Sequence, residues 1–198
     1  MLFFERKPCM KLLEDKILNE GRVLPGDVLK VDNFLNHQID VELVNKLGEE
    51  WYRLFKDEGI TKILTIEASG IGIACLAAQH FGVPVLFAKK SKSSNIGSDF
   101  YTTKVTSYTH GQVYDVIVSK KYISENDRVL VIDDFLANGC ALKALIELAK
   151  MSGATVVGAG VAIEKAYQGG GDEVRKMGYR VESLARIAAM NDGKIEFC

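Results

Sequence analysis

Short apolar runs rich in β-branched residues recur along the chain from residue 60 onward, and helical patterns separate several of them. Each run has the length and composition of a strand, and they lie at 62–67, 84–89, 113–119, 128–133 and 154–164. Helices are predicted over 71–81 and 139–151. Strands connected through helices pair in parallel and are covered by helices on both faces. The sequence therefore predicts an α/β fold with a mainly parallel central sheet flanked by helices.

The segment before this pattern is organised differently. Residues 10–21 are predicted to form an amphipathic helix that ends at Gly21, because apolar residues recur there at helical spacing. The stretch 23–40 mixes short extended pieces with turns. Asp40 is a suitable N-cap for a further helix over about 41–58.

The length of the chain, 198 residues, predicts one compact domain, which we place at 10–198. Residues 1–9, with the sequence MLFFERKPC, lack the basic and then apolar order of a secretory signal. We interpret them as an N-terminal extension and expect them to be disordered.

The composition narrows the classes of function. A net charge of −1 and a pI near 6.3 provide no chain-wide electrostatic basis for binding nucleic acid. No apolar run approaches the roughly 18 residues of a membrane span. The four cysteines are scattered without metal-ligand spacing, and three histidines give little material for a histidine metal centre. We therefore expect a cytoplasmic protein with reduced thiols and with neither a nucleic-acid nor a membrane partner.

The run at 128–133 leads into two acids, which a buried strand does not need. Asp133 and Asp134 precede the small-residue turn 137-ANGCA-141 and a helix start. Ligands of open parallel sheets bind beyond the carboxyl ends of the strands, and free amides at a helix N-terminus bind phosphate. Adjacent acids hold vicinal ribose hydroxyls or face Mg²⁺ through water. The pattern favours a phosphorylated sugar; the alternative is that the acids only cap and solvate the turn.

A second small-residue turn follows the strand at 62–67 and leads into another helix. It consists of Glu67, Ala68, Ser69 and Gly70. Its backbone amides form a second possible anion site at the same sheet edge. One such turn is mostly a matter of packing, but two turns in one sheet suggest a ligand with phosphate at both ends.

The polar stretch 90–112 interrupts the α/β pattern with more than twenty residues rich in Ser, Thr and Lys. Connections of this length are typically lids or disordered segments. Lys90 and Lys92 at its start suit the enclosure and release of a polyphosphate. The stretch therefore predicts a lid, and the alternative is an inert surface β-hairpin.

Together these features resemble the type I phosphoribosyltransferases. The stretch 129-VLVIDDFLANGCA-141 resembles their signature for phosphoribosyl pyrophosphate (PRPP), which is an apolar strand, two acids and a small-residue loop at a helix start. The resemblance implies the type I phosphoribosyltransferase fold with a flexible lid loop. It also implies a small base-binding hood from about 10–40 and 165–198. Mg²⁺ bound with PRPP, with no certain protein ligand, and a homodimer are implied as well.

Within this family, four stretches resemble the bacterial xanthine phosphoribosyltransferases. They are 29-LKVDNFLNHQID-40, 62-KILTIEASGI-71, 163-IEKAYQ-168 and 178-GYRVESLARI-187. The resemblance implies purine salvage, in which xanthine and PRPP give xanthosine 5′-monophosphate and pyrophosphate. One alternative is another purine phosphoribosyltransferase, acting on guanine, hypoxanthine or adenine. The other is a non-catalytic regulator that senses PRPP.

The resemblance also implies roles for particular residues. The 5′-phosphate is held by the backbone amides of Ala137, Asn138, Gly139, Cys140 and Ala141. The catalytic acids Asp133 and Asp134 bind the ribose 2′ and 3′ hydroxyls, with the purine N7 or a proton as an alternative target for Asp134. Pyrophosphate is received by Glu67, Ala68, Ser69 and Gly70, with Lys90 and Lys92 as contacts from the lid.

The implied base pocket must distinguish xanthine from hypoxanthine, which lacks the C2 oxo group. By the resemblance, Asn36 and Lys165 donate to that oxygen, and Leu29 gives an apolar contact. Phe135 stacks on the base or belongs to the core. Cys140 departs from the family pattern, since a polar residue is expected there; we predict that mild peroxide inhibits the protein and spares a Cys140→Ser variant.

Overall fold

The computed structural model describes residues 10–26, 28–91, 98–106, 113–191 and 193–198. In these residues, eight strands form one sheet in the order β10-β9-β8-β7-β3-β4-β6-β5. The strands are β3 (Lys62–Ile66), β4 (Val85–Ser91), β5 (Phe100–Thr106), β6 (Val113–Ser119), β7 (Arg128–Leu136), β8 (Thr155–Lys165), β9 (Val181–Asn191) and β10 (Lys194–Phe197).

The centre of the sheet is parallel, as predicted. Strands β4, β3, β7, β8 and β9 pair in parallel in that order. Their carboxyl ends therefore meet at one edge of the sheet, where a ligand of an open α/β sheet binds. The pairs β4–β6, β6–β5 and β9–β10 are antiparallel and extend the sheet on both sides.

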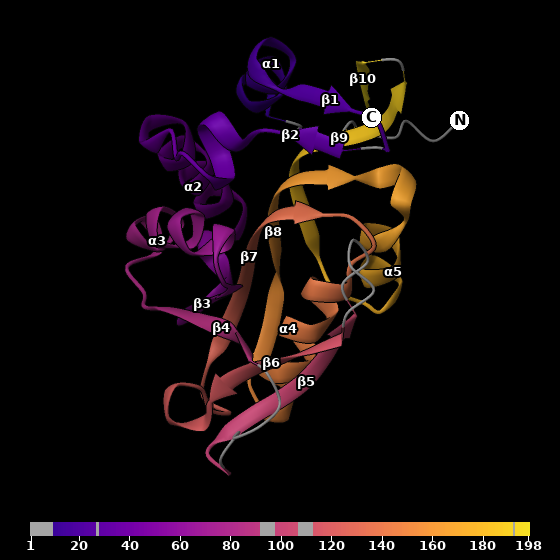
Figure 1. The fold of residues 1–198 in the computed structure, drawn as a ribbon. Helices are drawn as coiled ribbons and strands as arrows, with labels where there is room; N and C mark the ends of the chain where they lie inside the picture. The colour runs from indigo at the N-terminus through magenta and orange to yellow at the C-terminus, as the bar shows by residue number, and fades with distance from the viewer. Residues whose placement is uncertain (1–9, 27, 92–97, 107–112, 192) are drawn as a thin grey trace, which may run out of the picture.

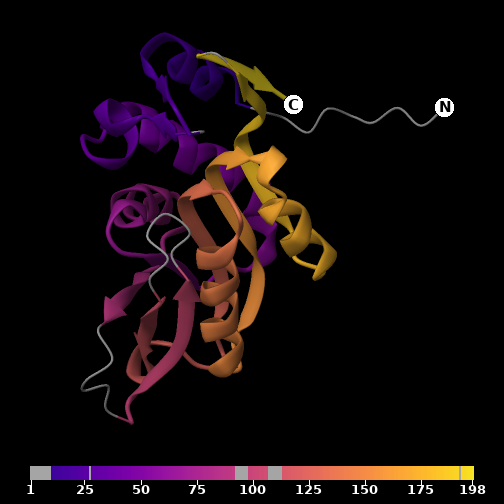
Figure 2. The ribbon, with the colours of Figure 1, turned by 45° about the vertical axis from the view of Figure 1, so that its right-hand side comes forward.

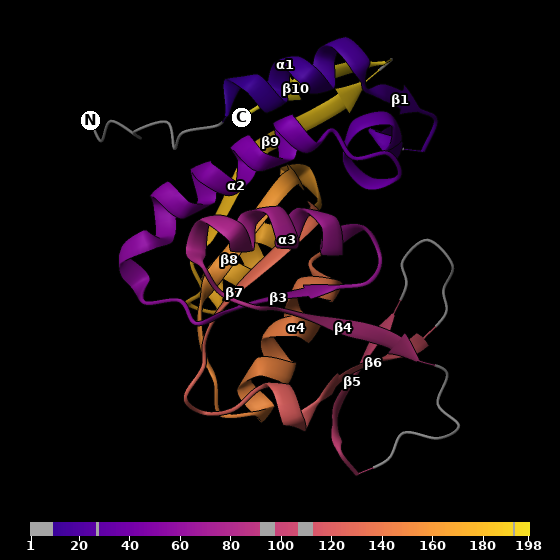
Figure 3. The same cartoon turned by 90° about the vertical axis from the view of Figure 1, so that its left-hand side faces the viewer.

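Helices cover both faces of this sheet (Figures 1 and 2). The helices are α1 (Lys11–Glu20), α2 (Val41–Phe55), α3 (Ser69–Phe81), α4 (Cys140–Met151) and α5 (Gly170–Lys176), with short turns η1 (Asp32–Asn36), η2 (Lys56–Glu58), η3 (Lys120–Tyr122) and η4 (Ala166–Gln168). Figure 3 shows α2 and α3 in front of the sheet and α4 behind it. Alternate residues of the strands separate the two cores: Ile63 packs with α2 and α3, whereas Leu64 packs with α4.

Both ends of the described chain meet above the carboxyl edge (Figure 1). Helix α1 packs on β9, and the Met10 amide donates to the Leu184 carbonyl at 2.6 Å. The antiparallel pair β1 (Arg22–Leu24) and β2 (Val28–Lys30) and the π-helical turn η1 complete this part. These segments lie within residues 10–40, one of the two ranges predicted for the hood, whose bounds and role stay predictions.

Two local predictions about helices are confirmed. Helix α1 ends at Glu20 with Gly21 as its C-cap. Helix α2 begins after Asp40, whose carboxylate accepts a hydrogen bond from the Leu43 amide at 3.0 Å. Among the described helices, none is long and apolar enough to cross a membrane.

Three details differ from the sequence predictions. The run at 113–119 forms β6, but it pairs antiparallel with β4 and β5. Within the polar stretch 90–112, residues 100–106 form β5, whereas 92–97 and 107–112 lie outside the described residues. Strand β7 runs three residues beyond the predicted end, to Leu136. The lid and the disordered extension at 1–9 remain predictions.

Candidate active site

Asp133 and Asp134 lie in β7, near its carboxyl end and between the neighbouring strands β3 and β8. Both are buried, at 6% and 8% exposure. The Asp133 carboxylate accepts a hydrogen bond from the Asp134 amide at 3.0 Å, and Asp134 accepts one from the Asn36 side-chain amide at 3.1 Å. The hood residue predicted to read the base is thus joined to one of the predicted catalytic acids.

Burial raises the pKa of Asp133 well above its ordinary value. The neighbouring charge of Asp134 adds to the rise, and Lys90 opposes it. The ionised carboxyl is therefore costly in the empty protein, and a ligand that brings hydroxyl donors or positive charge would offset this cost. Such a site is suited to a sugar that carries a cation with it.

The segment after β7 forms a loop at the start of a long helix. Gly139 has φ of +78°, and α4 begins with Cys140. The Asn138 side chain accepts a hydrogen bond from the Cys140 amide at 3.1 Å. Because the first turn of α4 leaves further amides without helical partners, this loop, 137–141, can bind an anion beside the two acids. We call it the phosphate loop.

The second predicted turn also lies beside the acids. Strand β3 ends at Ile66, the peptide between Glu67 and Ala68 is cis, and α3 begins at Ser69. A Cβ added at Gly70 would lie 3.2 Å from an Asp133 oxygen and 2.2 Å from the Thr65 hydroxyl. The helix starts of α3 and α4 therefore flank the acids, and a side chain at position 70 would not fit without a local shift.

Lys90 belongs to the sheet and not to the loop that follows it. It lies in β4, and its amide donates to the Glu67 carboxylate at 2.6 Å. Its ammonium lies 5.6 Å from the centre of the Tyr114 ring and acts on Asp133. This places one cation between the second turn and the acids. Lys92, the other predicted lid contact, falls outside the described residues.

The predicted base-binding residues come from three separate segments. Leu29 in β2 is buried in the core shared with α2 and α3, and the half-buried Phe135 packs against the same core. Lys165 is the last residue of β8, the strand next to β7. Within this group, Asn36 contacts the acids, through its hydrogen bond to Asp134. The stacking of Phe135 and the base contacts of Leu29 and Lys165 stay predictions.

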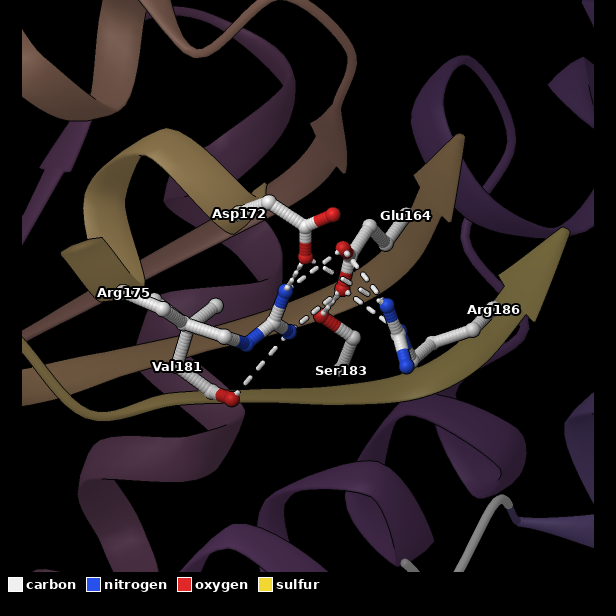
Figure 4. A network of polar contacts seen from close by, with 6 residues as sticks. All are labelled: Glu164, Asp172, Arg175, Val181, Ser183 and Arg186. Carbon is white, nitrogen blue, oxygen red and sulfur yellow. Dashed lines mark hydrogen bonds and ion pairs between the residues drawn. The ribbon is translucent and has the colours of Figure 1, made fainter. Parts of the chain in front are cut away.

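Two residues near the predicted site were absent from the sequence predictions. Tyr114 lies under Lys90, and its pKa is raised by burial, with Cys140 and Asp133 adding to the effect. Glu164 is buried directly before Lys165 and accepts hydrogen bonds from several side chains (Figure 4). The sequence signal for Glu164 was that it is the one acid in the apolar run 154–164. For Tyr114 there was no signal beyond the strand pattern.

The carboxylate oxygens of Asp133 and Asp134 suit a metal cation that arrives already bound to the substrate. Across the described residues, no group of three or more His, Cys, Asp or Glu side chains is arranged to hold a metal ion. Two carboxylates in one strand offer hard oxygen atoms of the kind that Mg²⁺ prefers. They are too few for a dedicated cage, so a phosphorylated ligand would have to supply further oxygens.

A cavity of about 1100 Å³ lies elsewhere, between β4, β6 and the turn η3. Its lining includes the exposed rings of Phe87, Phe100 and Tyr122 and the amines of Lys89 and Lys121. None of the predicted site residues lines it. The cavity therefore marks a second surface, separate from the acids and the two helix starts.

Comparisons with known proteins agree with this geometry. Residues 30–189 match a family model described as a phosphoribosyl transferase domain. The chain is 59% identical over 190 residues to a xanthine phosphoribosyltransferase of Lachnoclostridium phytofermentans, covering 95% of this chain and 98% of the relative. A xanthine phosphoribosyltransferase of Bifidobacterium adolescentis is 59% identical over 191 residues, covering 95% and 99%.

Solved structures show the same fold at low sequence identity. The APRTase of Giardia lamblia in complex with 9-deazaadenine matches with a TM-score of 0.75 and 22% identity, covering 89% of this chain and 98% of that one. An adenine phosphoribosyl transferase of Trypanosoma brucei also matches with a TM-score of 0.75, at 19% identity, covering 91% and 81%. With its acids and helix starts arranged as described and its family model matched over most of its length, the chain belongs to the phosphoribosyltransferase family.

Proposed function

We propose that this protein is a xanthine phosphoribosyltransferase of purine salvage. It would convert xanthine and PRPP into xanthosine 5′-monophosphate and pyrophosphate. The observation that carries the proposal is the hydrogen bond from Asn36 to Asp134, because it brings the base-reading hood onto acids that two helix starts flank. The highly similar relatives named xanthine phosphoribosyltransferase support the choice of base.

Each part of PRPP has a matching part of the site. The phosphate loop binds the 5′-phosphate, Asp133 and Asp134 bind the ribose hydroxyls, and the turn 67–70 receives pyrophosphate with Lys90 beside it. Mg²⁺ bound to the pyrophosphate would neutralise charge on the leaving group. Asp133 and Asp134 offer hard oxygen atoms that suit a cation held mainly by the substrate.

In the reaction, N9 of xanthine forms a bond to C1′ of the ribose, and the bond from C1′ to the pyrophosphate oxygen breaks. The pyrophosphate leaves with the electron pair of the broken bond and takes up the proton that N9 releases. The side chains align the two reactants and stabilise the positive charge that develops on the ribosyl group. Burial of Asp133 and Asp134 limits access of water, which would otherwise hydrolyse PRPP.

Base selection is assigned to Asn36 and Lys165. Both side chains carry donors, and xanthine has an oxo group at C2 that hypoxanthine and adenine lack. A pocket that donates to the C2 oxygen favours xanthine over bases that lack this oxygen. Leu29 would supply an apolar wall, and Phe135 would contact the face of the base.

The assay that tests this proposal uses PRPP and Mg²⁺ with xanthine, guanine, hypoxanthine and adenine, for the wild type, Lys165→Ala and the control Lys150→Ala. Lys150 is exposed in the last turn of α4. We expect xanthine to be preferred, Lys165→Ala to lose mainly that preference, and Lys150→Ala to behave as the wild type. A preference for adenine would refute the base assignment, and no reaction with any base would refute the enzyme.

We also propose a homodimer located in the cytoplasm. The support for the dimer is the cavity beside β4 and β6, where the rings of Phe87, Phe100 and Tyr122 are exposed and no described helix covers them. The mass in solution, measured by light scattering, should be twice that of the chain. Phe87→Glu should lower it to that of a single chain, whereas the control Val41→Glu, at the exposed start of α2, should leave it unchanged.

A further inference from the structure

Glu164 is a buried acid one residue before the proposed base reader Lys165 (Figure 4). Its side chain is 1% exposed. Its two oxygens accept hydrogen bonds from the Arg175 guanidinium at 2.8 and 2.7 Å and from the Ser183 hydroxyl at 2.5 Å. Arg186 donates to the same carboxylate at 3.1 and 3.4 Å. The end of β8 is therefore bound to both α5 and β9 at a single point.

The charges at this point fix its ionisation. Burial alone would raise the pKa of Glu164, but the hydrogen bonds from Arg175 and Ser183 and the charges of Arg175 and Arg186 lower it to about 2. A buried ion pair is weak evidence for stability, because well-packed apolar residues often replace it without loss. The geometry that the pair maintains is therefore the more informative property.

Arg175 connects this point to the phosphate loop through α5. The first residue of α5, Gly170, donates its amide to the Ala137 carbonyl at 3.2 Å. A Cβ added at Gly170 would lie 2.3 Å from that carbonyl oxygen and 2.4 Å from the Gly139 nitrogen. The backbone at the start of α5 therefore presses directly on the loop that would hold the 5′-phosphate.

Gly171, the next residue of α5, lies against both Glu164 and Arg175. A Cβ added at Gly171 would lie 2.2 Å from a Glu164 oxygen and 2.7 Å from the Arg175 guanidinium. An ion pair between Lys143 of α4 and Glu173 of α5 fastens the same short helix on its exposed side. Helix α5 thus lies between Glu164 and the phosphate loop, in contact with both.

We propose that Glu164 and Arg175 are positioning residues, which hold Lys165 and the phosphate loop in one fixed arrangement and so set the distance between base and 5′-phosphate. The proposal rests on the proposed function, in which these two segments bind opposite ends of the product. Neither side chain needs to touch the substrate. Removing the pair should weaken binding of both substrates and should change the chemical step little.

The first test compares Arg175→Met, Glu164→Gln and the double variant with the wild type. Glu164→Gln leaves both Arg175 and Arg186 without the charge of Glu164, whereas the double variant leaves only Arg186 without it, so the melting temperature of the double variant should lie above that of Glu164→Gln. We expect KM for PRPP and for xanthine to stay raised about tenfold in the double variant, with kcat within about threefold. Recovery of both KM values together with the melting temperature would show a purely structural role and overturn the proposal.

A second test keeps the network intact and disturbs only its contact with the phosphate loop. Gly170→Ala adds the crowding Cβ, and Gly169→Asn is the matched control because nothing lies within 4 Å of a Cβ there and Asn tolerates its φ of +76°. Binding of ribose 5-phosphate, measured by calorimetry, should weaken about tenfold in Gly170→Ala and less than about twofold in the control. Equal effects in the two variants would overturn the proposal.

The two tests separate failure of the inference from failure of the proposed function. If the wild type does not react with xanthine and PRPP, the function is wrong, and the ribose 5-phosphate measurement still tests how α5 positions the loop. If the wild type reacts and the variants bind both ligands normally, the function stands and the positioning role is wrong.

Discussion

Asp133 and Glu164 are both buried acids on neighbouring central strands, β7 and β8, yet their surroundings are opposite. Glu164 is matched by two arginines and a serine, which lower its pKa to about 2. Asp133 has another acid beside it, and burial raises its pKa. The protein supplies positive charge next to Glu164. It supplies little next to Asp133, so most of the counter-charge for Asp133 would have to come from a ligand.

This contrast distinguishes two roles of a buried charge, one in stability and one in ligand binding. At Glu164 the folded chain gains by ionising the group, so the charge contributes to stability. At Asp133 the folded chain loses by ionising it, and only a bound substrate would recover the loss. A buried carboxyl group whose ionisation is unfavourable without a ligand thus indicates a ligand site. A carboxylate that is fully paired with protein cations indicates a structural role.

The largest expected effect is on activity. Asp133→Asn keeps the shape of the side chain but removes the charge that faces the ribose and the developing ribosyl cation. We expect kcat/KM for PRPP to fall on the order of 10³-fold in steady-state assays. Asp127→Asn, which changes an acid directly before the start of β7 that is bound to Lys62 at 2.8 Å, serves as the control and should keep its activity. Comparable losses in both variants would remove the distinction between the two kinds of acid.

The next effect is on stability. Glu164→Gln leaves Arg175 and Arg186 without their shared charge, and we expect the free energy of unfolding at neutral pH to fall by about 3 kcal/mol in urea titrations.

The same acid has a defined pH dependence. Because the folded pKa of about 2 lies below the ordinary 4.5, its stabilisation is present above pH 4.5 and is lost as the pH falls toward 2. The wild type and Glu164→Gln should therefore differ in unfolding free energy at pH 7 and converge in strong acid. A difference that stays constant over this range would contradict the assignment.

The smallest effect has the opposite sign. The folded pKa of Asp133 is raised, so the group favours folding below its ordinary pKa of 3.8 and this advantage is lost as the pH rises through the folded value. Asp133→Asn should therefore be more stable than the wild type at pH 7 when no ligand is bound, and should lose that advantage in acid. A destabilised variant at pH 7 would show that the carboxylate is already matched without ligand.

The two acids and the two small-residue turns beside them could be predicted because each is a local pattern, a strand followed at once by polar or small residues and a helix. Their binding of anions stays a prediction. Asp133, Asp134 and the phosphate loop therefore lie beside one another as expected. The contact of Asn36 with Asp134 joins residues 98 positions apart, and only the resemblance to a family suggested that Asn36 belongs to the site.

Glu164 could not be assigned a role from sequence because its partners lie on two other elements. Arg175 belongs to α5 and Arg186 to β9, and the spacing of these residues along the chain gives no sign that they converge. The direction of β6 was missed for a related reason: its apolar alternation is equally compatible with parallel and antiparallel neighbours, and pairing with β5 decides between them.

The hood is built from the first and last described segments, since α1 packs on β9 and the Met10 amide binds the Leu184 carbonyl. During synthesis on the ribosome, the residues of both anion-binding turns are complete long before β9 emerges. A nascent chain would therefore possess the pieces that hold PRPP while its base pocket still lacked one wall. On the proposed function, selection of the base would then be the last property that the growing polypeptide acquires.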